Sequence, residues 1–496
     1  MMKPISFLFY LFYLTVFVNA TKPVISKNQR YIITLKPTTD IDDFIPNLLK
    51  GIFDLIGDVI GDIGDLLDGA HLDKRTNPVH IFESFDIEGS YKAISTKIEK
   101  NDLLGSILGH FDEITSIVPD EIIQFELPKP QSLHRRYYMR NSPIEYESHI
   151  TKNTSSSEPG NSTKPHVLQQ TNAPWNLARI SERKLDTKAP YLYPDTAGTG
   201  VRVYVIDDGI NKDHKDFNGR ASWGYSAIGD GDDVLIGGGH GSHVAGIIGG
   251  EQFGVAKNVT MVSVQVLKKN GQGSVSSLLS GIQWAAKDAK KYPKKSIVNM
   301  SLGVSSLAPS ANTLNDAITA AAKGGLPIIV AAGNSGTDAC DYVPAGNPLV
   351  YTVGASDNKD TLDPKSCWGK CVSIIAPGVN VESDYIGGTN ATATMSGTSM
   401  AAPHVTGIAA LILQDLHDPT PKNLFAALTK YATKGVIQQN QPHTVNLLAF
   451  NDVTLSKSDN TTTKAQPSKN KKSTHKKKSG SKKKKHTPKK HVANKD

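Results

Sequence analysis

From residue 200 onward, short runs of consecutive apolar residues alternate with longer stretches in which apolar residues recur every three or four positions. An uninterrupted short run is typical of a strand buried on both faces, and the three-to-four spacing is typical of a helix. The alternation predicts an α/β fold, with a parallel sheet covered by helices on both faces. The predicted strands are 201–206, 261–267, 297–302, 328–332 and 350–355, and the predicted helices are 275–290, 314–323 and 399–415.

The N-terminal part of the chain has a different pattern, which predicts a small α+β domain over residues 21–130. Strand-like residues at 29–36 precede a mixed region at 81–127 that contains a second strand-like stretch at 122–125. The insertion 40–72 has apolar residues at helical spacing with aspartates between them, which predicts an acidic amphipathic helix. This helix could pack on the small domain, or it could contact a membrane or a partner protein.

The first residues indicate the compartment. Lys3 precedes an apolar run at 5–18, and the sequence Val-Asn-Ala at 18–20 has the small residues of a cleavage site. The run is too short to cross a bilayer and is typical of a secretory signal peptide, which we assign to residues 1–20. We therefore expect the chain to enter the secretory pathway and to reach the exterior, the cell wall or the vacuole. Asn-x-Ser/Thr sequons are expected to make it a glycoprotein.

The excess of positive charge is confined to the C-terminus. The net charge is +8, but residues 464–496 hold 14 lysines against one acidic residue, so the rest of the chain carries −5. We expect 456–496 to be a disordered lysine-rich tail, compatible with simple solvation or with binding to anionic cell-wall glycans. The signal peptide argues against a nucleic-acid partner. The polar stretch 131–164, with a dibasic pair at 135–136, is expected to be a processing linker.

Three short motifs carry the chemistry. Each alone is weak, because a serine in a turn of small residues is usually only a helix cap. Together they offer an aspartate, a histidine and a serine in the chain order of one known type of catalytic triad. The motifs are Val-Ile-Asp-Asp-Gly at 205–209, His-Gly-Ser-His-Val-Ala-Gly at 240–246 and Gly-Thr-Ser-Met-Ala-Ala-Pro at 397–403.

With these motifs, and with Ala-Ala-Gly-Asn at 331–334, the chain resembles the subtilisin-like serine peptidases, in the branch of proteinase K and cerevisin. The resemblance covers a catalytic domain at 165–455. It implies that Ser399 is the nucleophile, His240 the general base, Asp207 the residue that orients the histidine, and Asn334 the donor to the oxyanion.

The resemblance also implies how substrates bind. A polypeptide in extended form would add as a strand to the cleft, and a roomy apolar pocket would favour apolar or aromatic residues before the cut. It further implies that the domain at 21–130 is an inhibitory propeptide whose C-terminal segment lies in the cleft. The implied substrate-binding residues are Asn270, Gly271, Gly273, Ser301, Leu302, Gly303, Ala331 and Gly333.

The three cysteines allow one disulfide and leave one thiol. The resemblance favours the pair Cys340–Cys371 over the pair Cys367–Cys371. No metal or cofactor is expected. His243 lies close to His240, but no carboxylate or cysteine stands at zinc-like spacing, and Ser373 stands where proteinase K has a calcium-binding carboxylate.

We therefore expect a secreted or vacuolar serine endopeptidase that is made as a zymogen and acts as a monomer. The alternative is a catalytically weak member of the same fold that is attached to the wall and binds proteins there. The four intact catalytic positions favour the enzyme. One departure from the family pattern is Asp208, whose carboxylate beside the triad is expected to raise the pKa of His240 and to shift the pH optimum upward.

Overall fold

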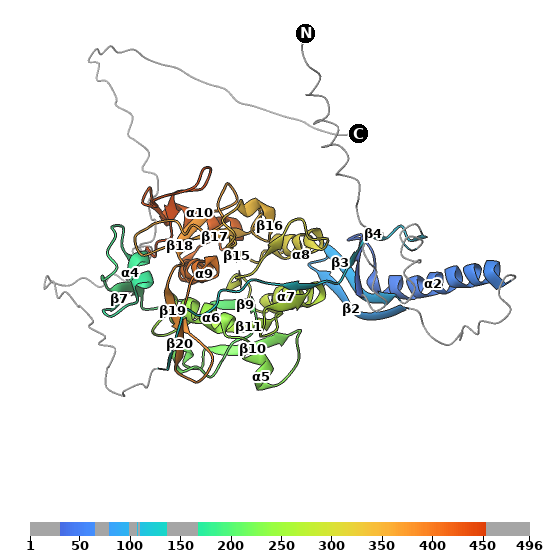
Figure 1. Cartoon of the computed structure of the whole chain (residues 1–496), viewed down its shortest axis with the longest axis horizontal. Helices are drawn as coiled ribbons and strands as arrows, with labels where there is room; N and C mark the ends of the chain where they lie inside the picture. Colours follow the sequence, from blue (N-terminus) through green and yellow to red (C-terminus); the bar gives the residue numbers. More distant parts are fainter. Residues whose placement is uncertain (1–29, 65–78, 99–106, 108–109, 136–166, 453–496) are drawn as a thin grey trace, which may run out of the picture. The chain divides into compact units, whose positions relative to one another are not determined.

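The computed structural model describes residues 30–64, 79–98, 107, 110–135 and 167–452 (Figure 1). Its largest element is a nine-stranded sheet, in which eight strands run parallel and only the edge strand β21 is antiparallel to its neighbour. In spatial order the strands are β10 (Ala221–Ser226), β11 (Thr260–Gln265), β9 (Arg202–Asp207), β13 (Ser296–Met300), β15 (Ile328–Ala331), β17 (Tyr351–Ser356), β18 (Ile374–Pro377), β22 (Leu447–Leu448) and β21 (Thr433–Lys434).

Helices cover both faces of this sheet. Successive residues of each strand point to opposite faces, so neighbouring residues pack against different helices. Val205 packs in one core with α6 (His240–Gly249) and α9 (Thr398–Asp415). Its neighbour Ile206 packs in a second core with α7 (Val275–Ala289) and α8 (Ala311–Lys323). The predicted α/β fold is therefore confirmed. The helices α4 (Trp175–Ser181) and α10 (Pro421–Tyr431) lie on the side of α6 and α9.

The N-terminal part forms a separate antiparallel sheet of four strands. Their spatial order is β2 (Val79–Ile87), β3 (Tyr91–Ile98), β1 (Arg30–Leu35) and β4 (Ile114–Pro119). One face of the sheet packs on α7 and α8, where its side chains join the second core.

The expected amphipathic insertion forms α2 (Ile41–Gly64) on the other face of the small sheet. The buried side chains of Phe44, Leu48 and Ile52 pack there with Ile33 and other residues of the strands. The described part of the helix thus uses its apolar residues within the small domain. Side chains from residue 53 onward, and the rest of the insertion, lie outside the described residues.

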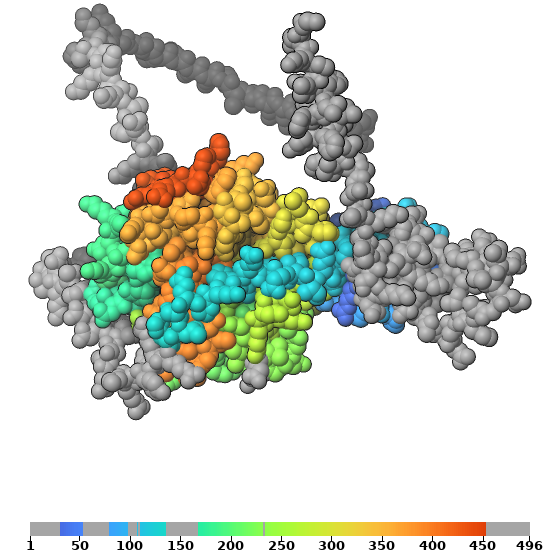
Figure 2. Space-filling view, in the orientation of Figure 1, coloured from blue at the N-terminus to red at the C-terminus, as the bar shows by residue number. Residues whose placement is uncertain are grey.

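A segment that we call the strap, residues 121–135, connects the two regions and runs across the face of the larger one (Figure 2). It contains β5 (Ile122–Gln124), which pairs with β12 (Gln272–Ser274), and β6 (Ser132–Arg135), which pairs with β20 (Ala391–Met395). β20 pairs on its other side with β19 (Val381–Asp384).

The strap changes one expectation from the sequence. The sequence predicts a linker over 131–164, but residues 132–135 form β6 because β20 offers an edge with which they can pair. The remainder of that stretch lies outside the described residues, as do the signal peptide, most of 99–109 and the tail. Within the described ranges, no helix is long and apolar enough to cross a membrane.

From residue 200 onward, the ends of the predicted strands and helices lie within three residues of the observed ends; α8, for example, begins at Ala311 rather than at 314. The other short elements are β7 (Val167–Gln170), β8 (Tyr191–Pro194), η1 (Lys215–Phe217), α5 (Asp232–Leu235), β14 (Val304–Ser305), η2 (Ala339–Asp341) and β16 (Tyr342–Val343).

Candidate active site

Asp207 and His240 form a buried pair at the carboxyl end of the parallel sheet. Asp207 is the last residue of β9, and His240 is the first residue of α6. The imidazole Nδ1 lies 2.8 Å from Asp207 Oδ1 and 3.0 Å from Oδ2. A carboxylate at Nδ1 holds the proton on that nitrogen and leaves Nε2 free to accept one. Among the described residues, Nε2 has no hydrogen-bond partner.

The surroundings of His240 stabilise its protonated form. Burial lowers the pKa of His240, but the charge and hydrogen bond of Asp207 and the charge of Asp208 outweigh burial and raise this pKa above its ordinary value. The direction agrees with the effect expected of Asp208 from the sequence. The carboxylates thus make the histidine a stronger base than an isolated imidazole.

Asp208 also has a second role, which the sequence did not indicate. Its carboxylate accepts hydrogen bonds from the backbone N–H groups of Gly238 (2.9 Å), His240 (3.3 Å) and Gly241 (2.8 Å). These groups lie at the start of α6, where a helix has unpaired N–H groups and the positive end of its dipole. Burial and the neighbouring Asp207 raise the pKa of Asp208 to about 7, while His240 and these hydrogen bonds act in the opposite direction.

Gly238 leaves room for this arrangement. A Cβ at residue 238 would lie 2.4 Å from the backbone oxygen of Lys269 and 2.9 Å from Asp208 Oδ2. A side chain at 238 would therefore displace the carboxylate that holds the start of α6.

Ser399 is the second residue of α9, next to the end of β13. Its hydroxyl donates to the backbone oxygen of Ser301 (3.2 Å), and the hydroxyl of Ser301 donates back to the oxygen of Ser399 (3.1 Å). The serine oxygen is thus held at a helix N-terminus, with its proton engaged by a backbone acceptor. Rotation about the Cα–Cβ bond moves the oxygen, and rotation about the Cβ–Oγ bond redirects its proton.

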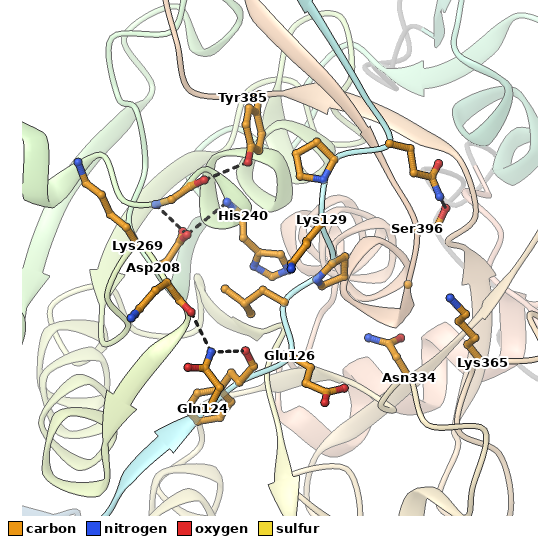
Figure 3. A pocket seen from close by; sticks show the side chains of 18 of the residues that line it. Gln124, Glu126, Lys129, Asp208, His240, Lys269, Asn334, Lys365, Tyr385 and Ser396 are labelled. Carbon is orange, nitrogen blue, oxygen red and sulfur yellow. Dashed lines mark hydrogen bonds between the residues drawn. The ribbon is translucent and has the colours of Figure 1, made fainter.

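Asn334 is fixed by a threonine that the sequence analysis did not single out. Its amide oxygen accepts hydrogen bonds from the backbone N–H (2.8 Å) and the hydroxyl (2.9 Å) of Thr398. The same hydroxyl accepts from the N–H of Gly333 (3.1 Å). Because the oxygen is occupied, the Nδ2 group of Asn334 is left to donate into the pocket in which Figure 3 shows it.

The structure brings the expected substrate-binding residues together on two sides of the strap. On one side the strap bonds to the backbone oxygens of Asn270 (2.8 Å, from Gln124 Nε2) and Gly271 (2.9 Å, from Phe125 N–H), and its Ile123 pairs with Gly273. On the other side lies a pocket of about 520 Å³. Ser301, Leu302, Gly303, Ala331 and Gly333 line this pocket together with Ser399.

Among the described residues that line this pocket, the charged ones belong to the strap. The described residues that the larger region contributes to its lining are all uncharged. A neighbouring pocket of about 740 Å³ contains His240, Asp208 and Asn334, and Lys129 of the strap lies over it (Figure 3). Tyr385 also lines this second pocket; its hydroxyl donates to the backbone oxygen of Gly238 (3.0 Å), a role without any signal in the sequence.

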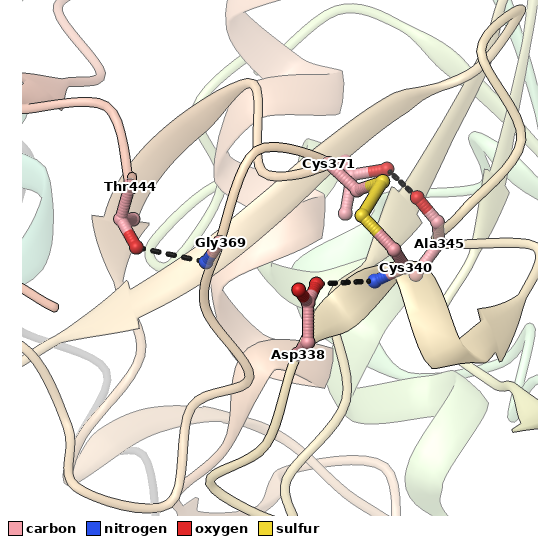
Figure 4. Close-up of a disulfide and its surroundings, with 7 residues drawn as sticks. Asp338, Cys340, Ala345, Gly369, Cys371 and Thr444 are labelled. Carbon is pink, nitrogen blue, oxygen red and sulfur yellow. Dashed lines mark hydrogen bonds between the residues drawn. A yellow bond between two sulfur atoms is a disulfide. The ribbon is translucent and has the colours of Figure 1, made fainter. Parts of the chain in front are cut away.

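Two further sequence predictions concern groups near the site. A disulfide joins Cys340 to Cys371 (Figure 4). Cys367 is a buried thiol. His243 is buried, and its Nε2 lies 3.2 Å from the backbone oxygen of Val381 and 3.0 Å from that of Ala393. Burial lowers the pKa of His243 to about 3, so this histidine is neutral and ties α6 to β19 and β20.

Comparisons with known proteins identify the family of the chain. The sequence matches the subtilase family over residues 198–470. Cerevisin of Saccharomyces cerevisiae is 44% identical over 304 residues, which cover 57% of this chain and 47% of cerevisin. Subtilisin-like protease 3 of the same yeast is 39% identical over 393 residues, 75% of each chain.

Two other similarities each cover 56% of this chain. The subtilisin-like serine protease Pen ch 18 of Penicillium rubens is 44% identical over 299 residues, 56% of this chain and 60% of that protein. The crystal structure of a cold adapted subtilisin-like serine proteinase superposes with a TM-score of 0.53 and 40% identity, covering 56% of this chain and 98% of that one. The resemblance drawn from the sequence motifs is thereby confirmed, and the chain belongs to the subtilase family.

Proposed function

We propose that the chain is a serine endopeptidase in which Ser399 attacks the peptide carbonyl. The observation that carries this proposal is the buried Asp207–His240 pair. Its Nε2 has no partner among the described residues, and His240 lines a pocket together with Asn334 and Gly397, the residue before α9. A hydroxyl is a weak nucleophile unless a base takes its proton during attack. Rotation of the Ser399 hydroxyl away from Ser301 toward Nε2 would supply that base.

His240 would then carry the proton from the serine to the departing amine. His240 takes it from Ser399 as the serine oxygen bonds to the carbonyl carbon, and gives it to the departing amine when the peptide bond breaks. Asp207 keeps the Nδ1 proton in place and stabilises the imidazolium. Water repeats the sequence on the acyl-serine and releases the second product.

The negative charge on the carbonyl oxygen would develop at the start of α9. The backbone N–H of Ser399 and the Nδ2 of Asn334 are the proposed donors, and the positive end of the helix dipole favours the charge. Thr398 supports this role because it fixes the oxygen of Asn334 and therefore the direction of Nδ2.

The preferred substrates are polypeptides with an apolar or aromatic residue before the cut. The pocket beside Ser399 supports this preference, because the described residues that the larger region contributes to it are uncharged. A basic side chain would find no carboxylate there other than those of the strap. The backbone pairing seen at β12 would hold the preceding residues of any sequence.

We further propose that residues 21–130 act as an intramolecular inhibitor, so that the chain is made as a zymogen. Asp120 supports this: its carboxylate accepts from the backbone N–H (2.8 Å) and the hydroxyl (2.7 Å) of Ser276 at the start of α7. Phe125 is buried in the second core. Pro128 lies against Gly397, since a Cβ on that glycine would meet the proline ring at 3.0 Å.

Two prolines near the catalytic centre would protect the strap from hydrolysis. The sequence there is Leu127-Pro128-Lys129-Pro130. A proline nitrogen is tertiary and its ring fixes the backbone, so bonds that precede proline fit poorly where a leaving amine must be protonated. The Leu127–Pro128 and Lys129–Pro130 bonds would then resist cleavage, and the mature enzyme would leave by the secretory pathway that the signal peptide predicts.

The test is N-terminal sequencing and mass measurement of the product, for the wild type and Ser399→Ala side by side. We expect the wild type to start near residues 165–170 and the variant to keep its N-terminal part. If both mature identically, another protease makes the cut and self-processing is wrong. If a correctly folded wild type also fails to cleave an apolar peptide substrate, the enzyme function is wrong, and a wall-attached binding protein becomes the better account.

A further inference from the structure

The edge of β20 is a surface whose use the catalytic mechanism leaves unexplained. In the structure β6 covers it as an antiparallel strand, with Ser132–Arg135 opposite Ala391–Thr394. Gln131 extends the contact: its backbone N–H donates to the oxygen of Thr394 (2.8 Å), and its side chain donates to the hydroxyl of Ser396 (2.8 Å). The opposite edge of β20 is already paired with β19, so β6 completes the hydrogen bonding of β20.

The pairing between β6 and β20 is made by backbone. Leu133 is 66% exposed and His134 is exposed, so neither side chain enters a pocket. An edge that binds through backbone N–H and C=O groups accepts an extended chain of almost any sequence. The strap therefore occupies a surface that could hold a different polypeptide in the same way.

The location of this edge connects it with the chemistry. β20 ends at Met395, and the turn through Gly397 leads into α9 and Ser399. On the other side of the catalytic centre, the strap pairs with β12. The strap thus runs in one direction from β12, past His240 and Ser399, to β20, as Figure 2 shows for its path across the surface.

The register gives the distance from the cut. Pro128 lies beside Gly397 at the catalytic centre, and β6 at 132–135 follows it by four to seven positions. A substrate that runs through the cleft in the same direction has the residues before its cut along β12. With the cut taken after the residue at the position of Pro128, its residues four to seven positions beyond the cut then reach β20.

We propose that, once the strap has left, the β20 edge binds the downstream part of a polypeptide substrate as an added antiparallel strand. This inference rests on the proposed peptidase function and deepens it. It names the substrate class as extended polypeptides that continue for at least seven residues after the cut, in preference to short peptides.

The first test uses three internally quenched peptides and the mature enzyme obtained from the full chain. They share the residues before the cut and carry two downstream residues, eight downstream residues, or the same eight with alternate backbone nitrogens methylated. We expect kcat/KM to be about tenfold higher for the long peptide than for the short one, equivalent to one or two net hydrogen bonds. Methylation keeps every side chain and is expected to abolish the gain.

A pair of variants tests the same surface from the enzyme side. Because Thr394 directs its backbone oxygen to the strap, Thr392, two residues away, directs its N–H to the same side. Thr392→Pro removes this donor, and we expect the ratio of kcat/KM for the long and short peptides to fall toward one. Thr392→Ala is the matched control, because it keeps the N–H, and it is expected to keep the ratio of the wild type.

The outcomes separate the inference from the function on which it rests. If the wild type cleaves the short and long peptides equally, or cleaves the methylated peptide as well as the unmodified one, the inference is overturned while the peptidase function stands. If none of the three peptides is cleaved by folded, strap-free enzyme, both fail. Because the wild-type series decides alone, misfolding of Thr392→Pro would not leave the proposal untested.

Discussion

Two helices begin at the catalytic centre, and different side chains accept hydrogen bonds from their first N–H groups. α6 begins at His240, and the carboxylate of Asp208 accepts hydrogen bonds from its first N–H groups. α9 begins beside Ser399, and the neutral amide oxygen of Asn334 accepts the N–H of Thr398. A carboxyl group therefore stands at the start of the first helix, and a neutral amide stands at the start of the second.

The difference follows from the charges that the proposed reaction creates. The histidine must become a cation, so negative charge at the start of α6 favours the step through Asp207 and Asp208. The carbonyl oxygen must become an anion, so a carboxylate at the start of α9 would oppose the step. The comparison predicts that substitutions will act through proton transfer on the α6 side and through oxyanion stabilisation on the α9 side.

The largest effect is expected where the α6 side loses the partner of the base. Asp207→Asn offers Nδ1 an amide in place of a carboxylate and favours the wrong tautomer of His240. We expect kcat to fall by about 10⁴ at neutral pH, with the fold retained, as measured by steady-state cleavage and circular dichroism. A loss of less than tenfold would remove Asp207 from the mechanism.

On the α9 side, Asn334→Ala removes the proposed oxyanion donor. We expect kcat to fall by about 10²–10³ while KM changes little, because the interaction forms only in the transition state. Both kcat and KM are measured for the variant and the wild type with one apolar peptide substrate. If instead KM rose by the same factor while kcat stayed unchanged, Asn334 would contribute to binding of the substrate in its ground state.

A smaller effect is expected from Thr398, which positions Asn334 without contacting the substrate. Thr398→Val removes the hydroxyl bonds to Asn334 and Gly333. We expect kcat to fall by about tenfold, in line with one or two lost hydrogen bonds. Thr398→Ser restores the hydroxyl and should recover most of the rate; failure of the serine variant to do so would point to packing instead.

The smallest effect on rate is expected at Asp208. Asp208→Asn removes a negative charge near His240 and lowers the pKa of the histidine. The acidic limb of the kcat/KM profile should therefore move to lower pH, by a shift measured over a pH series. Asp213→Asn, at an exposed carboxylate paired with Lys212, is the matched control. An identical limb in Asp208→Asn and wild type would contradict the electrostatic role.

The same variant should change how stability depends on pH. The pKa of Asp208 is raised from its ordinary value of 3.8 to about 7 in the folded protein, so the folded state binds the proton more tightly than the unfolded state. Its contribution is fully present below pH 3.8 and is lost as pH rises toward 7. Thermal midpoints of the wild type should decline over this window relative to those of Asp208→Asn. Parallel curves for the two proteins would contradict the raised pKa.

The comparison also shows what could be predicted from sequence. The apolar run of β9 ends at Asp207, and Ser399 opens an apolar helix, so local pattern was enough to place both residues at element ends. The role of Asp208 at the start of α6 does not follow from the sequence pattern, because none of the predicted helices begins at His240.

Contacts between residues that lie far apart in the sequence could not be predicted from its local pattern. Thr398 meets Asn334 across 64 positions, and neither residue type signals such a contact. The polar segment 132–135 has no strand pattern, and it forms β6 only because the edge of β20 pairs with it. The residues with intrinsic chemistry were thus visible in the sequence, whereas those that position them depend on the tertiary fold.

The central claim is that Ser399 is an activated nucleophile. Its most direct test is to treat the mature, strap-free chain with a fluorophosphonate and to map the modified residue by peptide mass spectrometry. The account predicts a single adduct on Ser399, none in Ser399→Ala, and much slower labelling in Asp207→Asn. A folded mature chain that stays unlabelled, or that carries the adduct on another residue, would contradict it.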